Sequence, residues 1–221
     1  MLNWLGGGCI YMPGADGKRV PFELSIAVHS DAGYRADNGI YGTMGLCTTA
    51  DGDGRTYYPA GISRQASADF ARMMVSTVQN DLSAAFGKTW TKREVWDRNY
   101  GESRMPNVPS VILETLSHQN FADLRMGHDP NFKFVLARAI YKALLRFVNF
   151  QHGTTDIVVQ PLPVNSFSAL LSDTCSKAIL SWKPTADGQE PSAAPTHYII
   201  YTREGNAGFD NGTLVTDTSA A

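Results

Sequence analysis

The sequence is poor in cysteine, and this excludes two kinds of stabilising framework. Its three cysteines, Cys9, Cys47 and Cys175, are too few and too scattered for a set of disulfides. None of them belongs to a C-x-x-C pair, so a zinc site made of cysteines is not supported either. Because cysteine side chains are usually buried, we expect three buried or half-buried thiols.

The sequence also lacks an excess of charge and any long apolar run. Its 19 Lys and Arg against 21 Asp and Glu give a formal net charge of −2, and no basic stripe is visible. This pattern disfavours nucleic acid and an anionic membrane surface as partners. No stretch reaches the roughly 18 apolar residues of a membrane span, so we expect no transmembrane segment. Residues 1–14 also lack the basic start and apolar core of a secretory signal peptide.

What the sequence does contain, up to about residue 150, is an alternation of strand and helix patterns. Short apolar runs predict buried strands at 22–29 and 110–115, and a weaker β-like run covers 39–48. Apolar residues at three- and four-residue steps predict amphipathic helices over 63–86 and about 131–149. The alternation predicts an α/β fold in which helices flank a sheet.

Other segments of this part read as irregular. Residues 1–21 and 51–62 are rich in turn-forming residues and are interpreted as loops, and 88–109 shows no period. Near residue 151 the helical period ends, and short β-like runs separated by turns follow. We therefore predict an α/β domain over 1–152 and an all-β sandwich over 153–221, with strands at 156–163, 177–182, 197–202 and 213–215.

Two ionisable residues occupy unusual places in the predicted strands. His29 and Glu114 each end an otherwise apolar strand, and ligand crevices of open α/β sheets form at the carboxyl ends of strands. A carboxylate after Val-Ile-Leu is costly unless it is paired or bound to a metal. Each residue also has an ordinary interpretation, as a structural histidine or as the first solvated residue after a strand.

Three sequence blocks carry a resemblance to a known family. Residues 25–32 (SIAVHSDA) resemble an S-x-H-x-N segment, and residues 109–117 (PSVILETLS) resemble P-x-V-L-V-E-x-G-F. Asn120, Asp123 and the run 129–141 (DPNFKFVLARAIY) resemble N-x-x-D followed by a helix ending in L-A-x-A-I. In order and spacing, over about 20–150, the chain resembles the zinc-dependent N-acetylmuramoyl-L-alanine amidases.

This resemblance implies a fold, a reaction and a site. His29 would be the zinc ligand contributed by its strand, Glu114 the catalytic carboxylate, and Zn²⁺ the cofactor, with a water in the open position. The reaction would hydrolyse the amide bond between N-acetylmuramic acid and L-alanine of peptidoglycan. The partner would be the muramyl peptide, and the location the periplasm or the extracellular side of the cell envelope.

The chain departs from the family pattern in ways that leave other functions open. No histidine precedes His29 and the only earlier glutamate is Glu23, so the family's first His and Glu ligands have no counterpart. We therefore expect an N-terminally truncated amidase domain that is weakly active or inactive alone. Asp31 replaces the family's Asn, and Leu116 its Gly. The alternatives are a non-catalytic module for cell-wall glycopeptide binding or adhesion, and a zinc peptidase of similar layout.

Several neighbouring polar residues have two interpretations each. His118 could line the same crevice or act as a ligand, and it could equally be a surface residue. Asp31 and Asp123 could orient His29 or the Glu114 loop, and Asp123 could instead be a helix or turn cap. The charged residues Arg98, Glu102 and Arg104 read as a solvated loop, in which an arginine could meet the acidic stem peptide.

The end of the chain resembles the opening strands of a fibronectin type III domain. The resemblance is carried by 178–182 (AILSW) and 197–201 (HYIIY), and it implies that Trp182 and Tyr198 belong to the core of a sandwich. Such a sandwich needs about seven strands, and only three or four fit before the last residue given. A partial sandwich with an exposed edge is therefore predicted.

Overall fold

A computed structural model of the chain describes residues 1–174 and 176–221. It divides into two compact units, Met1–Thr155 and Asp156–Ala221. Of the three thiols expected to be buried, Cys9 and Cys47 are buried as predicted, and Cys175 lies outside the described residues.

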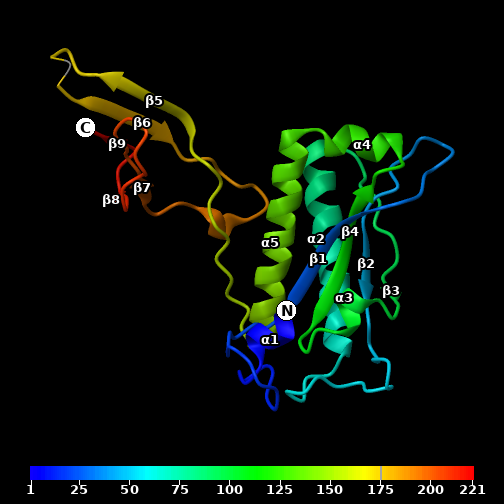
Figure 1. The fold of residues 1–221 in the computed structure, drawn as a ribbon. Coiled ribbons are helices and arrows are strands. Elements are labelled where there is room, and N and C mark those ends of the chain that lie inside the picture. The colour runs from blue at the N-terminus through cyan, green and yellow to red at the C-terminus, as the bar shows by residue number, and fades with distance from the viewer. Residues whose placement is uncertain (175) are drawn as a thin grey trace. The chain divides into compact units, whose positions relative to one another are not determined.

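The first unit is built on a four-stranded mixed sheet (Figure 1). The strands follow the order β1-β4-β2-β3, in which β1 and β4 are parallel and β2 is antiparallel to β4. β4 therefore lies inside the sheet, with β1 at one edge. The bounds are β1 Ser25–Asp31, β2 Met44–Cys47, β3 Trp96–Asp97 and β4 Ser110–Ser117.

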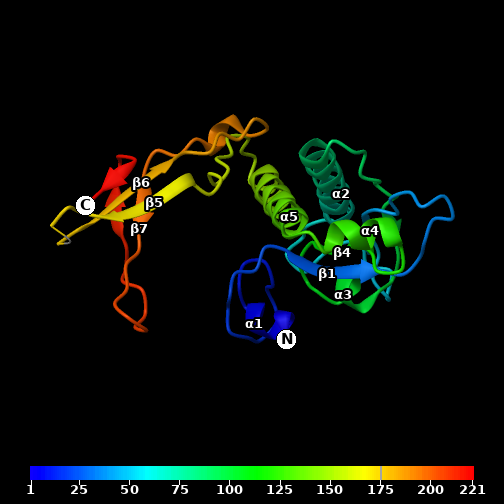
Figure 2. The ribbon, with the colours of Figure 1, turned by 90° about the horizontal axis from the view of Figure 1, so that it is seen from above.

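Two long helices, α2 (Gln65–Phe86) and α5 (Pro130–Gln151), cover one face of this sheet (Figure 2). Their apolar stripes pack together and onto β4, and the rings of Phe70 and Phe147 stack with centroids 4.5 Å apart. Gly87 ends α2 in the left-handed conformation, with φ of 60°, which glycine adopts at little cost. Both predicted helices and the α/β class are thus confirmed.

The opposite face of the sheet is covered more thinly. A small apolar cluster lies on it, formed by Met44, Leu46 and Ile112 with Ala27 packed against them. The four-residue helix α3 (Gly101–Arg104) lies on the same face, on the side away from α2 and α5 (Figure 2). This face is where polar side chains of β1 and β4 reach solvent.

Short elements account for the misread segments of the first unit. Residues 1–21 contain α1 (Leu2–Gly6), and 88–109 contains β3 and α3, although both segments were predicted to be irregular. The helix α4 (Phe121–Gly127) follows β4. Elements of two to seven residues present at most two helical turns, so their sequences carry no usable period.

The second unit consists of strands and one short 3₁₀ helix. The strands at 177–182, 197–202 and 213–215 are confirmed, whereas the strand predicted at 156–163 is wrong. Pro161 and Pro163 cannot donate backbone hydrogen bonds to a ladder, and pairing starts only at Asn165. The sheets are β5-β6-β9 and β7-β8, with bounds β5 Asn165–Leu171, β6 Ala178–Lys183, η1 Pro191–Ala193, β7 Tyr198–Ile200, β8 Thr213–Val215 and β9 Ser219–Ala220.

An aromatic contact centres the packing in the second unit. Trp182 is 6% exposed, and its ring meets that of Tyr198 edge-on with centroids 5.3 Å apart. The indole N–H of Trp182 has no hydrogen-bond partner.

No helix in the described part of the chain is long and apolar enough to cross a membrane.

Candidate functional site

The sheet brings His29 and Glu114 side by side. They are paired residues in the parallel ladder of β1 and β4. Side chains alternate between the two faces of a strand, and Ala27 and Ile112, two residues earlier on the same strands, belong to the thinly covered face. His29 and Glu114 therefore project from that face, opposite α2 and α5.

The two strands extend further than their apolar runs indicate. His29 and Glu114 were predicted to end their strands, but β1 continues to Asp31 and β4 to Ser117. The polar residues after Glu114 are held inside the structure: Thr115 donates its hydroxyl to the His29 carbonyl at 2.8 Å. Because hydrogen bonding satisfies these groups without apolar side chains, the hydrophobic pattern stops before the strand does.

Glu114 is the perturbed acid of this face. Its Oε2 is buried and has no hydrogen-bond partner. Desolvation raises the pKa of Glu114, and the nearby Asp31 carboxylate raises it further, while His29 and Arg93 act in the opposite direction. A raised pKa makes the carboxylate a better proton acceptor, and it favours the protonated form that can later deliver the proton.

Glu102 is a site residue that the sequence reading assigned to a solvated loop. Its Oε2 lies 3.0 Å from Nε2 of His29, and both side chains are about half exposed, at 57% and 43%. Glu102 belongs to α3 and follows His29 by 73 positions in the sequence. Only the tertiary packing of α3 against the sheet brings it there, so no local pattern could have revealed it.

Asp31 serves Arg93 rather than His29. One carboxylate oxygen accepts from Arg93 Nη1 at 2.6 Å, and the other accepts from the backbone of Ala32 at 2.7 Å. The Arg93 guanidinium also lies over the ring of Tyr41, 4.2 Å from its centroid. This cluster sits beside Glu114 and influences its pKa, so Asp31 acts on Glu114 electrostatically.

Asp123 is a fully buried clamp. Its carboxylate accepts backbone N–H groups of Tyr41, Gly42 and Ser117 at 2.8, 2.9 and 2.9 Å, and the Asn120 amide at 2.9 Å. It therefore ties the start of α4 to the loop before β2 and to the end of β4. Of its two sequence interpretations, the geometry fits an anchor for the segment that follows Glu114.

His118 is exposed, and its Nδ1 lies 3.1 Å from the hydroxyl oxygen of Ser30. Among residues 1–174 and 176–221, no three His, Cys, Asp or Glu side chains are grouped so that they could hold a metal ion. His29 and Glu102 supply two donors at ligand-like separation, one fewer than a catalytic zinc site takes from its protein. The described residues do not by themselves fit a complete zinc site.

No protein-family model matches the chain, and no curated protein does. Among solved structures, it is similar to an N-acetylmuramoyl-L-alanine amidase from Clostridium difficile 630, with 16% identity and a TM-score of 0.44 over 57% of this chain and 58% of that one. It is also similar to the N-acetylmuramoyl-L-alanine amidase AmiC2 of Nostoc punctiforme, with 16% identity and a TM-score of 0.44 over 60% of this chain and 61% of that one. For the catalytic domain of CwlV from Bacillus (Paenibacillus) polymyxa, the identity is 18% and the TM-score 0.42, over 57% of this chain and 58% of that one. The chain thus spans less than two thirds of each structure.

Proposed function

We propose that the first unit is part of a peptidoglycan amidase, which hydrolyses the amide bond between N-acetylmuramic acid and L-alanine. One observation carries the proposal. His29 and Glu114 come from sequence blocks 85 positions apart that resemble two segments of the amidase family, and they are register partners on one face of the sheet.

In this proposal Glu114 is the general base and then the general acid. Its raised pKa and its unpartnered buried oxygen suit a group that takes a proton from the attacking water and delivers it to the departing alanine nitrogen. His29 faces the same space, and Asp123 fixes the backbone beyond Glu114.

Zinc dependence belongs to the same proposal and rests on the family resemblance. His29 would be one ligand, with its imidazole already opposed by the Glu102 carboxylate. Since the described residues hold no group of three ligands, we expect this chain to be a weak enzyme. A cell-wall substrate places the protein in the periplasm or outside the cell.

The test is the release of peptide from a purified muramyl peptide by the whole chain, with zinc in excess and products identified by mass. We expect slow cleavage between the lactyl group and L-alanine. Glu114→Gln should abolish it because the amide cannot accept the water's proton, and the exposed Glu94→Gln should retain it.

Three other outcomes would refute the proposal. Cleavage that persists in Glu114→Gln would remove the assigned base. Binding of the muramyl peptide without cleavage would leave the chain as a glycopeptide-binding module, a function that the lack of a third metal ligand among the described residues also fits. Release of a terminal amino acid instead of the whole peptide would identify a peptidase.

A further inference from the structure

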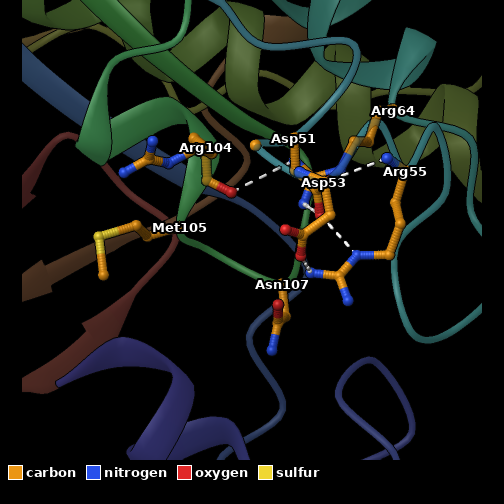
Figure 3. Close-up of a pocket in the computed structure, with 8 residues that line it drawn as sticks. Asp51, Asp53, Arg55, Arg64, Arg104, Met105 and Asn107 are labelled. Carbon is orange, nitrogen blue, oxygen red and sulfur yellow. Dashed lines mark hydrogen bonds and ion pairs between the residues drawn. The ribbon is translucent and has the colours of Figure 1, made fainter.

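A cavity of the first unit has neither His29 nor Glu114 in its wall. It has a volume of about 380 Å³ and is formed by the loop after β2 and by the segment around the end of α3 (Figure 3). Asp51, Asp53 and Arg55 come from the loop, Arg64 from its end, and Arg104, Met105 and Asn107 from the α3 side. The wall therefore contains three guanidinium groups and two carboxylates.

The two carboxylates of the cavity already have a cation. Arg55 Nε lies 2.7 Å from Asp51 Oδ2, and Arg55 Nη2 lies 2.8 Å from Asp53 Oδ2. The Arg55 hydrogen bond is the main reason why the pKa of Asp51 is lowered to about 2. Because Arg55 neutralises this acidic loop, the cavity is not a cation site.

Arg64 forms a buried part of the wall, and its hydrogen-bonding capacity is mostly unused. The residue is 3% exposed. Its Nη1 reaches the Arg104 carbonyl at 3.3 Å, its Nη2 is 3.7 Å from Asp51 Oδ2, and its Nε has no partner. The guanidinium stacks on Tyr58 at 4.4 Å. A buried guanidinium with only long contacts is costly unless an anion completes its shell.

Arg104 adds a second guanidinium to this part of the wall. Within the described part of the chain, no carboxylate pairs with it. Gly52 lies beside it, since a Cβ there would be 3.9 Å from Arg104 Nη1, and the Asn107 side chain also lines the cavity. Met105 is 64% exposed and offers an apolar surface next to these groups. Two guanidiniums and an amide can donate hydrogen bonds to a carboxylate. The apolar surface of Met105 suits a small aliphatic side chain beside that carboxylate.

The helix α3 connects this cavity with the candidate catalytic face. Glu102 contacts His29, and Arg104, two residues later, lines the cavity. Side chains two apart on a helix point in nearly opposite directions, so the two places lie on different sides of α3. An extended peptide of four residues spans about 13 Å, which is long enough to cross a helix about 10 Å wide.

We propose that this cavity binds the terminal carboxylate of a short peptide, through Arg64 and Arg104. That the peptide is the stem peptide of a muramyl substrate rests on the amidase function proposed above. The carboxylate adds a shorter ion pair to the long contacts of Arg64 and forms an ion pair with Arg104. The cavity thereby selects stem peptides whose terminal carboxylate is free.

The test is a chemical-shift titration of the isotope-labelled whole chain with L-alanyl-γ-D-glutamyl-L-lysyl-D-alanine and with its C-terminal amide. We expect the free acid to bind at least about tenfold more tightly, since each lost charge-assisted contact costs about a factor of ten or more. Arg104→Gln should remove this preference. Arg98→Gln, which changes an arginine stacked on Trp96 outside the cavity, should keep it.

Arg64→Lys provides a second variant that keeps the buried charge while removing the planar fork, and it too should bind the acid more weakly. Equal affinity for acid and amide, no binding of either, or an unchanged preference in Arg104→Gln would overturn the proposal. The tetrapeptide contains no muramyl–alanine bond. Tighter binding of the free-acid tetrapeptide, without hydrolysis of muramyl peptide, would therefore refute only the amidase function. Hydrolysis of muramyl peptide, with equal binding of the acid and the amide, would refute only the carboxylate-binding cavity.

Discussion

At the scale of single residues, Glu114 is the acid of the candidate site whose pKa is raised. Its Oε2 is buried without a partner, and the carboxylate that most raises its pKa is Asp31, which lies 2.6 Å from Arg93 Nη1. Desolvation and this neighbour penalise the charged form, so the folded protein retains the Glu114 proton to higher pH than the unfolded chain does. A carboxyl group whose pKa is shifted by burial and a neighbouring charge is typical of a functional site. Its ionised form lowers the stability of the folded protein at higher pH.

The pH dependence of stability follows from this shift. Because the folded pKa of Glu114 lies above its ordinary value of 4.5, its contribution to stability is fully present below that pH and is lost as pH rises through the folded pKa. We expect Glu114→Gln to gain stability relative to the wild type as pH rises from about 4 to about 7.

Thermal melts of the two proteins across this range measure the effect. Glu94→Gln is the matched control because Glu94 is exposed on the same unit, and its melting temperature should follow that of the wild type at every pH. A melting difference between Glu114→Gln and the wild type that stays constant, or that shrinks with rising pH, would show that the Glu114 pKa is not raised by folding.

At the scale of elements, α4 holds the candidate site in place through Asp123. The three backbone N–H groups that donate to the Asp123 carboxylate belong to two separate segments, the loop at Tyr41 and Gly42 and the end of β4 at Ser117. These N–H groups would be buried without partners if the carboxylate were absent. The clamp therefore fixes where β4 ends and how the loop leads into β2, on both sides of Glu114.

We expect Asp123→Asn to lower the free energy of unfolding by about 3 kcal/mol, because one oxygen that accepts two buried N–H groups becomes a donor facing them. Urea denaturation followed by circular dichroism measures the loss. Asp69→Asn, which affects only the exposed pair with Arg72, should change stability by less than about 0.5 kcal/mol. A loss of the same small size in both variants would contradict the clamp.

At the scale of the whole molecule, the sequence predicts the layers better than it predicts the contacts between them. The helices α2 and α5 and the strands β1 and β4 follow from their apolar periods, which the core requires for burial. The pairing of His29 with Glu114 depends on strand order, which periodicity does not encode. Glu102 reaches His29 only because a four-residue helix, too short to show a pattern, packs on the sheet.

The burial of Arg64 in the wall of the cavity could not be predicted from the sequence, for a similar reason. The loop of the cavity, 51–62, was predicted as polar and irregular, and the following Arg64 reads as the start of a helix. Burial of that arginine to 3% exposure depends on Tyr58 below it and on the backbone of Arg104, 40 residues away. Such a group becomes visible only when partners distant in sequence have been brought together.

The measurement that tests the central claim most directly is the stoichiometry and affinity of zinc binding by the whole chain, in competition with a chromophoric chelator. The proposal under test is that His29, on the face shared with Glu114, is a zinc ligand; the Glu102 carboxylate lies 3.0 Å from its Nε2. We predict one weakly bound zinc per chain, because two protein ligands hold zinc far less tightly than three. His29→Ala should abolish this binding and His128→Ala should preserve it. Zinc binding that is unchanged in His29→Ala would contradict the account.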